Sequence, residues 1–583
     1  MPLPHLRRLL PHLSRHRGEL VRGLGCLLLT TAASVANPWV LRHAVDDLTI
    51  EVTQEKLWLY AGVLLGLVAF EGVFRFLMRW VLIGTSRRLE YELRNEVFEH
   101  MTRLSPRYYQ EHRIGELLSR ASNDMAAVRA VLGPGIMYTA TTIATFAGTV
   151  TLMLLISPRL TGLALIPLVL VSWLVRHYGR QVHDHFESVQ AQLAEMSALV
   201  QENLSGARVV RAYAQESHEE AHFAAANEEY VSRSQGLVRT TGMLWPGIQF
   251  FMGLGSVIVL WLGGRMVVAG TISLGEFVAF GAYLVMLHWP MIALGWVVNL
   301  FERGEASMGR INAILDAAVE IRDEDPLAVD EIRGDVEFRG LTFGYNGTPV
   351  LHDIDLRVPA GSTVAVVGPT GSGKSTLVSL VPRLWNAPPG TLLVDGHDAR
   401  RIRLDVLRAA VGFVPQESFL FSDTVRENIA FGLRGGDADR VEWAAEVAQL
   451  AADIRGFPKG FETPVGERGI TLSGGQKQRA ALARALAVDP RILVLDDTLS
   501  AVDTQTEEKI LQGLREVMRT RTTFLVSHRV STVKSADLII VLREGRIAER
   551  GTHDELVAQG GFYADLHRRQ LLEEQMEQSG DVA

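Results

Sequence analysis

The residues best suited to chemistry lie in the second half of the chain, in two apolar segments that end in polar groups. The segment TVAVVGPTGSGKSTLVSLV, residues 363–381, is typical of a buried strand, a glycine-rich loop and a helix. Its core fits G-x-x-x-x-G-K-[ST], in which backbone N–H groups surround phosphate at a positive helix N-terminus. The segment RILVLDDTLSAVD, residues 491–503, is an apolar run that ends in Asp496 and Asp497.

These residue types predict a site for a nucleotide and Mg²⁺. The predicted phosphate loop comprises Gly368, Pro369, Thr370, Gly371, Ser372, Gly373, Lys374, Ser375 and Thr376. We expect Lys374 to reach the β- and γ-phosphates and the Ser375 hydroxyl to bind Mg²⁺. An isolated pair of carboxylates after a strand is usually a solvated turn. Beside a phosphate loop, however, Asp496 is expected to hold the metal and Asp497 to polarise a water.

Composition excludes several classes of protein. A chain of 583 residues is too long for one core, so two or more domains are expected. A mean hydropathy of +0.14 with 48% hydrophobic residues is high for a soluble protein. The net charge of −8 argues against a dedicated nucleic-acid binder, so no nucleic-acid partner is expected. The single cysteine, Cys26, excludes an intrachain disulfide.

Hydrophobic stretches of about 20 residues, long enough to cross a bilayer, recur through the first 300 positions. Six spans are predicted, at roughly 21–45, 57–84, 135–157, 160–178, 243–266 and 274–298. Arginines precede the first span and crowd the loop after the second, whereas the loops after spans one, three and five carry few. We therefore expect a multi-pass protein of the cytoplasmic (inner) membrane, in contact with the lipid bilayer, with both termini and the second half in the cytosol.

The connections at about 85–134 and 179–242 are too long and too regular for simple loops. They are predicted to be helices that continue out of the membrane and fold back near 106–120 and 201–216. Each turn carries a short amphipathic segment that suits docking on a cytosolic partner, although an ordinary helical hairpin fits the periodicity equally.

Charged residues at membrane depth are costly and usually face a bundle interior or a wet cavity. Glu71, Arg75 and Arg79 are spaced as a helical i, i+4, i+8 row within the second span. An internal ion-pair ladder is the favoured interpretation, and contact with a substrate or a lipid headgroup is the alternative. Methionines and aromatic residues crowd spans five and six, which suits either a promiscuous apolar pocket or helix packing.

The composition changes after the sixth span. Residues 311–333 turn acidic and acquire a proline, which is typical of a linker. From 334 to 570 short β-rich runs alternate with helices, so an α/β domain is expected, followed by a tail at 571–583. The predicted fold class is thus an all-α six-helix transmembrane domain over 1–310, followed by an α/β P-loop ATPase domain.

The segment TLSGGQKQRAALARAL, residues 471–486, resembles the signature of ATP-binding-cassette (ABC) ATPases. The other landmarks of that family appear on either side of it in the family's order: Tyr345 in LTFGY, Gln416 in FVPQESFLF, Glu467 in VGERG, Asp503 in SAVD and His528 in LVSHR. With six spans before the cassette, the whole chain resembles a type IV ABC half-exporter. In detail it resembles subunits of heterodimeric bacterial multidrug exporters of the TmrAB kind.

The resemblance implies ATP and Mg²⁺ as ligands and gives roles to further residues. Tyr345 would stack on adenine, Gln416 would contact Mg²⁺ or the attacking water, and His528 would bond the γ-phosphate. The signature residues Ser473, Gly474, Gly475 and Gln476 would bind a nucleotide held by a second ABC half-transporter chain. The implied function is ATP-driven export of small hydrophobic or amphipathic compounds; a lipid or peptide exporter and an ATP-gated channel are the alternatives.

Asp497 departs from the family pattern, which has glutamate there to polarise the attacking water. One methylene less withdraws the carboxylate, and a misplacement of about 1 Å can cost on the order of 10²-fold in rate. We therefore expect a slow site on this chain and a heterodimer in which the chain completes the faster site of its partner. A homodimer with two slow sites is the alternative.

Overall fold

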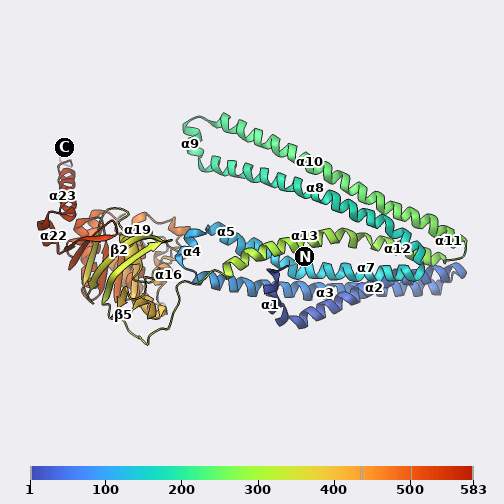
Figure 1. The fold of residues 1–583 in the computed structure, drawn as a ribbon, viewed down its shortest axis with the longest axis horizontal. Coiled ribbons are helices and arrows are strands. Elements are labelled where there is room, and N and C mark those ends of the chain that lie inside the picture. The colour runs from blue at the N-terminus through green and yellow to red at the C-terminus, as the bar shows by residue number, and fades with distance from the viewer. Residues whose placement is uncertain (1–2, 434, 436, 500–501, 581–583) are drawn as a thin grey trace. The chain divides into compact units, whose positions relative to one another are not determined.

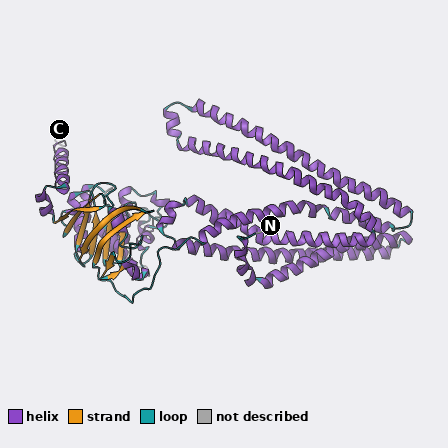
Figure 2. Cartoon of the chain, viewed as in Figure 1, coloured by secondary structure: helices purple, strands orange, loops and turns teal. Residues whose placement is uncertain are grey.

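The computed structural model of the protein describes residues 3–433, 435, 437–499 and 502–580. The chain divides into two compact units: Met1–Thr102 with Arg113–Ala317, and Arg103–His112 with Ala318–Ala583. The first unit is helical, whereas the second contains the strands (Figure 2). As predicted, six long apolar helices are followed by an α/β domain.

Six long apolar helices in the first unit are long enough to cross a membrane, as predicted: Arg17–Ile50, Gln54–Arg103, Ile114–Ile156, Pro158–Ser205, Glu216–Val268 and Leu274–Leu315. The elements of this unit are η1 (Leu6–Leu9), α1 (Leu10–Arg15), α2 (Arg17–Ile50), α3 (Gln54–Arg103), α5 (Ile114–Ser119), η2 (Arg120–Asp124), α6 (Met125–Ala130), η3 (Val131–Gly135), α7 (Ile136–Ile156), α8 (Pro158–Ser205), α9 (Ala207–Ala212), α10 (Glu216–Ile258), η4 (Val259–Gly263), α11 (Gly264–Val268), α12 (Leu274–Met286) and α13 (His288–Leu315).

Local sequence explains where these helices begin and end. The tight turn between α7 and α8 places Ser157 at the N-cap, where its hydroxyl accepts a hydrogen bond from the Leu160 N–H, and Pro158 at the first helical position. The start of α12 has a capping box between Ser273 and Glu276. Asp46 of α2 also holds this start, because its carboxylate accepts the Ser273 hydroxyl at 2.7 Å.

The long connections continue as helices well beyond the apolar spans, as predicted. α8 and α10 run side by side and are joined by the short helix α9 (Figure 1). The other predicted turn contains α4 (Pro106–Glu111) and α5. The structure assigns α4 to the second unit, within which the Ser105 hydroxyl donates to Glu320 at 3.0 Å. The sequence did not predict this assignment.

Among the residues that the structure describes, the charged row of the second span forms one ion pair. Glu71 is buried and pairs with Arg75 one turn along α3. Arg79 lies outside this pair and lines a pocket instead. The predicted ladder is therefore limited to its first two members.

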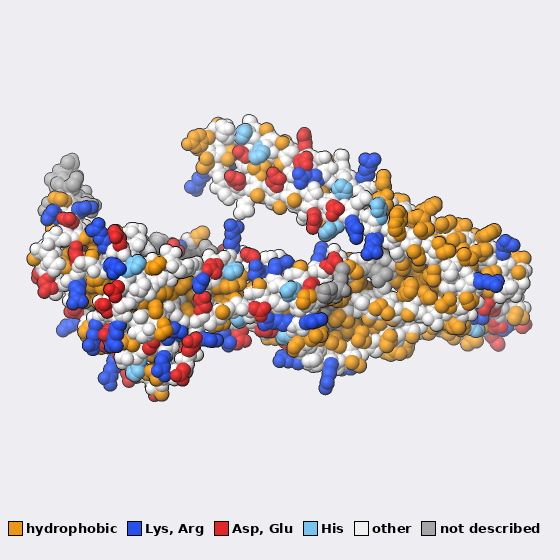
Figure 3. Space-filling view, in the orientation of Figure 1, with side chains coloured by type: hydrophobic (Ala, Val, Ile, Leu, Met, Phe, Trp, Pro, Cys, Tyr) orange, Lys and Arg blue, Asp and Glu red, His pale blue; other side chains and the backbone are white. Residues whose placement is uncertain are grey.

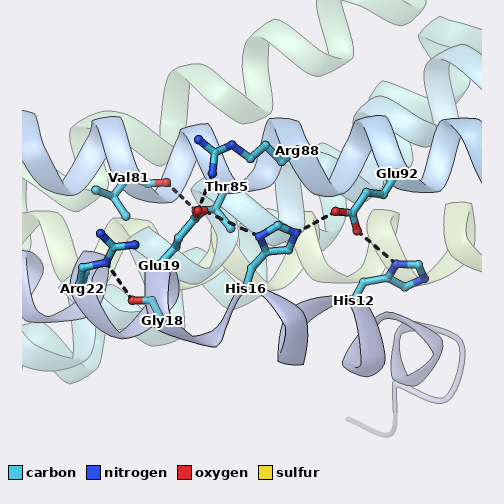
Figure 4. A network of polar contacts seen from close by, with 9 residues as sticks. All are labelled: His12, His16, Gly18, Glu19, Arg22, Val81, Thr85, Arg88 and Glu92. Atoms are coloured by element: carbon cyan, nitrogen blue, oxygen red, sulfur yellow. Dashed lines mark hydrogen bonds and ion pairs between the residues drawn. The ribbon is translucent and has the colours of Figure 1, made fainter.

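The start of the chain is attached to α3 by a network of histidines and glutamates (Figure 4). The Nε2 atom of His16 lies 2.9 Å from a Glu92 carboxylate oxygen, and its Nδ1 atom lies 3.8 Å from Glu19. The Thr85 hydroxyl donates to Glu19 at 2.8 Å. His12 lies 3.7 Å from Glu92, so both histidines contact α3.

The second unit is built on two sheets. Its strands are β1 (Val336–Tyr345), β2 (Thr348–Val358), β3 (Thr363–Val367), β4 (Leu392–Val394), β5 (His397–Asp398), β6 (Val411–Val414), β7 (Ile492–Asp496), β8 (Thr522–Val526), β9 (Leu538–Arg543) and β10 (Arg546–Gly551). The larger sheet has the order β10-β9-β3-β8-β7-β6 and is parallel from β9 to β6. The smaller sheet has the order β2-β1-β4-β5 and is antiparallel.

Helices complete the second unit. They are α14 (Lys374–Ser379), η5 (Ala399–Arg401), α15 (Leu404–Ala409), α16 (Val425–Ala430), α17 (Ala438–Val447), α18 (Ala451–Gly456), η6 (Gly460–Glu462), η7 (Glu467–Gly469), α19 (Gly474–Ala487), α20 (Thr504–Met518), α21 (Val530–Val533), α22 (His553–Gln559) and α23 (Phe562–Gly580). α13 extends to Leu315, beyond the predicted domain limit at 310, and α23 crosses the one at 570. The division at 310, 333 and 570 remains a prediction.

We expect His16→Ala to loosen the start of the chain from α3. A hydrogen bond contributes about 1 kcal/mol, so the populated open form should rise by about fivefold. Limited trypsin digestion of the purified full-length protein, followed at the sites after Arg15 and Arg17, measures this change.

The control is His183→Ala, because His183 pairs with Glu187 of its own helix, at 3.3 Å. Equal cleavage rates in the two variants would contradict the attachment described above.

Candidate nucleotide site

The phosphate loop follows the fully buried strand β3, and its backbone needs glycine at two positions. Gly368 has φ +153°, and a Cβ there would lie 2.1 Å from the Leu542 carbonyl oxygen. Gly373 has φ +99° and precedes α14, where a Cβ would lie 2.7 Å from the Leu351 side chain. Side chains would therefore force the loop away from the shape that turns its N–H groups inward.

Lys374 is held inside the loop that it follows. Its ammonium group donates to the carbonyls of Gly368 and Pro369, each at 2.9 Å, and the side chain is buried. Burial lowers the pKa of Lys374, while the nearby carboxylates of Asp496 and Asp497 oppose this shift. The cation is thus positioned beside the loop's backbone amides, where phosphate oxygens would bind.

Ser375 and Asp496 meet across the edge of the larger sheet. β8 separates β3 from β7, so the carboxyl ends of these parallel strands open onto the same edge. The Ser375 hydroxyl donates to Asp496 Oδ1 at 3.0 Å. Burial raises the pKa of Asp496, and the hydrogen bond from Ser375 offsets part of that rise. A hydroxyl and a carboxylate oxygen are both ligands that Mg²⁺ accepts.

Asp497 directly follows the strand in the left-handed region, with φ +48°, a conformation that aspartate tolerates better than most residues. Its N–H donates to the Val526 carbonyl at 3.0 Å, which fixes the turn against β8. Asp497, Gln416 and His528 line one pocket of about 270 Å³.

The pocket brings together ten of the predicted residues. They are Thr370, Gly371, Gly373, Lys374, Ser375, Thr376, Gln416, Asp496, Asp497 and His528. Gly368 and Pro369 contribute carbonyls to Lys374 from behind it. The Ser372 hydroxyl is buried and makes no hydrogen bond within the described part of the chain, and Ser372 is not among the residues that line the pocket.

Tyr345 is linked to the site through Thr376, which lines the pocket. Its hydroxyl donates to the Thr376 hydroxyl at 3.2 Å, and its ring packs edge-on against Trp385 at 4.8 Å between centroids. Sequence reasoning missed Trp385, which packs against Tyr345. It also missed Val350 and Val526, which line the pocket. These are apolar or aromatic residues in ordinary core patterns, so their spacing carried no signal.

The signature residues form the start of a helix instead of lining this pocket. Ser473 caps α19 in a capping box, with the Gln476 N–H donating to its hydroxyl and the Ser473 N–H donating to Gln476. The Gln476 side-chain amide and Arg479 both donate to Asp453, at 2.8 and 2.7 Å. Together with Gly474 and Gly475, these residues are absent from the described lining of the nucleotide pocket.

Asp503 caps α20, because its carboxylate accepts the Thr506 N–H at 2.9 Å. These hydrogen bonds lower the pKa of Asp503. Ser500 and Ala501, in the same predicted turn, lie outside the described residues.

The arrangement fits ATP with Mg²⁺. The loop N–H groups and Lys374 would hold the phosphates, and Ser375, Asp496 and Gln416 would hold the metal, which would neutralise phosphate charge. Two observations support this fit: the two glycines whose Cβ atoms would clash with surrounding atoms, and the adjacent hydroxyl and carboxylate oxygens of Ser375 and Asp496.

Known proteins share both units. The family described as ABC transporter transmembrane region matches residues 20–291, and the family described as ABC transporter matches residues 351–500. A Bacillus subtilis protein, "Probable multidrug resistance ABC transporter ATP-binding/permease protein YheI", is 36% identical over 94% of each chain. The Escherichia coli protein "Multidrug resistance-like ATP-binding protein MdlA" is 35% identical over 96% of this chain and 95% of its own.

A protein named "ATP-dependent lipid A-core flippase" from Syntrophus aciditrophicus is 32% identical over 98% of this chain and 95% of its own. Among solved structures, "Structure of a bacterial Atm1-family ABC exporter with ATP bound" has a TM-score of 0.79 and 31% identity. It covers 95% of this chain and 98% of that one. The second unit is accordingly an ATPase domain that binds ATP with Mg²⁺ and couples its hydrolysis to transport. The chain belongs to the ABC transporters, as a half-exporter in which a membrane region and an ATPase region are fused.

Proposed function

We propose that this chain exports small hydrophobic or amphipathic compounds across the cytoplasmic membrane as the slow-site subunit of a heterodimer. The observation that carries the proposal is the division of the site. One pocket gathers the phosphate loop, Asp496 and Asp497, while the signature residues form the separate start of α19. A second half-transporter chain would supply the missing signature and receive the one at Ser473.

The nucleotide-binding residues are complete. Lys374 would bind the β- and γ-phosphates, Ser375 and Asp496 the metal, and Gln416 the metal or the attacking water. Tyr345 would stack on the adenine, a contact that any purine ring can make. This chain therefore supplies every residue expected on its own side of the bound ATP, and the partner supplies the signature.

The hydrolysis step departs from the family pattern at Asp497, whose side chain is one methylene shorter than the glutamate of the family. Asp497 would polarise the attacking water and His528 would hydrogen-bond the γ-phosphate. The Asp497 backbone is fixed by its bond to Val526, so the shorter side chain cannot move forward without breaking that turn. General-base catalysis contributes about 10²–10⁴-fold, and a misplaced base forfeits part of it.

ATP binding would be coupled to transport through a difference in ATP affinity between the open and the closed dimer. ATP can favour the closed dimer only by binding it more tightly than the open one. The signature of each chain would provide that difference, because it contacts nucleotide only on closure. Both termini and the ATPase domain would lie in the cytosol, where ATP is available.

The substrate class rests on the membrane helices and on the names of relatives. Methionine and aromatic side chains in α10 and α13, including Met243, Trp245 and Trp289, are exposed on this chain. Adaptable side chains of this kind suit varied apolar ligands. One relative is named for multidrug resistance and another for lipid flipping. A lipid or peptide substrate is the second candidate, and an ATP-gated channel is the third.

We expect ATP-dependent accumulation of a fluorescent amphipathic dye in inside-out vesicles that contain the chain and its partner. Lys374→Ala should weaken ATP binding at this chain's site and lower the accumulation by about 10-fold or more, because an ionic phosphate contact is lost. Lys459→Ala, an exposed lysine of the same unit, is the control. Equilibration without accumulation above the outside concentration would favour a channel.

Asp496→Asn should stabilise the protein at pH 7 in the absence of nucleotide. Because the pKa of Asp496 is raised, its ionised form costs stability at pH values above that pKa, and asparagine removes this cost. About 1 kcal/mol raises the Tm of such a domain by about 2–4 °C. Thermal unfolding measured with and without Mg²⁺-ATP should show a higher Tm and a smaller shift on adding ligand.

Asp503→Asn is the control for this experiment. The pKa of Asp503 is lowered, so its ionised form is favoured in the folded state and its replacement should not raise the Tm. A lower Tm for Asp496→Asn than for the unmodified protein would contradict the burial effect.

Substitutions of Asp497 and Ser473 test whether this chain works in a heterodimer. Asp497→Glu and Asp497→Asn should each change ATP turnover of the heterodimer by less than about twofold, because the partner's site turns over faster by about 10²-fold. Ser473→Arg should lower that turnover by about 10-fold or more, since it blocks the helix start offered to the partner's nucleotide. Steady-state phosphate release measures all three.

The chain expressed alone distinguishes the homodimer. We expect little substrate-stimulated hydrolysis from it. Vigorous stimulated hydrolysis by the chain alone, lost in Asp497→Asn, would overturn the heterodimer.

A further inference from the structure

A pocket of about 570 Å³ lies between the first two membrane helices, α2 and α3, far in sequence from the nucleotide site. Its lining includes Arg22, Arg79, Arg87 and Arg88, against one carboxylate, Glu19. We call it the arginine pocket. Figure 3 shows hydrophobic side chains covering the membrane helices, with lysine and arginine side chains where this cover ends over α1 and α2.

The pocket has more positive charge than its carboxylates can neutralise. Arg88 pairs with Glu19. Arg87 lies 3.2 Å from Glu90, but Glu90 also pairs with Arg94 at 2.7 Å and with Arg129 at 3.1 Å. One buried carboxylate is therefore shared among three guanidinium groups, which leaves a positive surplus at the pocket.

Among the residues that the structure describes, Arg22 and Arg79 of the pocket form no ion pair, although the charge of Arg22 also acts on Glu19. Arg22 donates to the Gly18 carbonyl of its own helix at 3.2 Å. Arg79 forms no ion pair with any residue that the structure describes, and Glu71, about two turns earlier on α3, pairs with Arg75. A guanidinium within a membrane span needs an anionic partner or a path to water.

The same pocket has an apolar side. Phe76 and Trp80 line it, are 62% and 71% exposed, and stack on each other at 5.9 Å between ring centroids. Tryptophan is enriched where the apolar core of a bilayer meets its headgroups. The lining thus favours a ligand that has an anionic end and a hydrophobic body.

The level of the pocket fits the inner leaflet. Arg22 begins the first predicted span, and Arg87 follows the second. α3 then continues to Arg103, where the chain enters the ATPase unit, so this end of α3 belongs to the side on which ATP is bound. Arg79 lies eight residues before Arg87, about 12 Å along the helix, within reach of the headgroup level by its long side chain.

We propose that the arginine pocket binds an anionic phospholipid of the cytoplasmic leaflet. Its phosphate group contacts Arg22 and Arg79, and its acyl chains lie against Phe76 and Trp80. The site is separate from the exported substrate and from ATP, so it stands or falls independently of the proposed function.

Native mass spectrometry of the purified full-length protein, with any chain that copurifies, tests the proposal. Phosphatidylglycerol and phosphatidylcholine are titrated separately, and we expect tighter retention of phosphatidylglycerol. Arg22→Gln combined with Arg79→Gln should weaken retention of phosphatidylglycerol on the order of 20-fold, since each arginine near a membrane surface contributes about fivefold.

The matched control is Arg15→Gln combined with Arg17→Gln. It removes the same charge from exposed positions outside the pocket and should change retention by less than about twofold. Both double variants should elute and unfold as the unmodified protein does. Equal retention in the two double variants, or displacement of the lipid by millimolar inorganic phosphate, would overturn the proposal.

A photoreactive phenylalanine analogue in place of Trp80 tests which molecule covers the pocket in native membranes. A product heavier by the mass of an anionic phospholipid supports the proposal. A product joined to another protein chain would show that a partner subunit occupies this face, and would overturn it.

Discussion

A peptide group inside a bilayer must satisfy its hydrogen bonds within its own segment, and the membrane half of this protein follows from that constraint. Each of the six spans is a helix, and the helices that leave the membrane do so without a break. α3 has 50 residues and α8 has 48. Prolines such as Pro38 and Pro167 lie within these helices without ending them. The long helical extensions therefore continue, outside the membrane, helices that the bilayer requires within it.

The ATPase half is organised by a different constraint, the shared edge of parallel strands. β3 and β7 are far apart in sequence, yet β8 between them aligns their carboxyl ends. A hydroxyl from one segment and a carboxylate from the other meet there, between Ser375 and Asp496. The buried strands hold the Asp496 carboxylate at a depth where its charge is costly without a ligand, so the site is arranged for binding at some expense in stability.

Much of this could be predicted from the sequence because the signals were local. Hydrophobic length predicted six spans, and the glycine–lysine–serine pattern predicted the phosphate loop, whose side chains share one pocket with Asp496. Contacts between distant segments could not be predicted in this way. Trp385 packs against Tyr345 and Asp46 holds the start of α12, but no periodicity links either pair.

The charged row of the second span illustrates the same limit. Its i, i+4, i+8 spacing gave Arg75 and Arg79 equivalent places in a ladder, yet only Arg75 pairs with Glu71. Arg79 lies about two turns from Glu71, and its surroundings instead include Arg22 and Glu19 of the neighbouring helix α2. The spacing of residues along α3 does not indicate which side chains α2 places beside it.

The capping box at the start of α19 has a thermodynamic consequence. Ser473 and Gln476 satisfy each other within this chain, and Asp453 anchors Gln476 from another helix, so the helix end is already ordered. A partner that approaches it meets a finished surface and has no segment to fold. The heat-capacity change of association should then reflect only the apolar area that the two surfaces cover, without the larger contribution typical of folding coupled to binding.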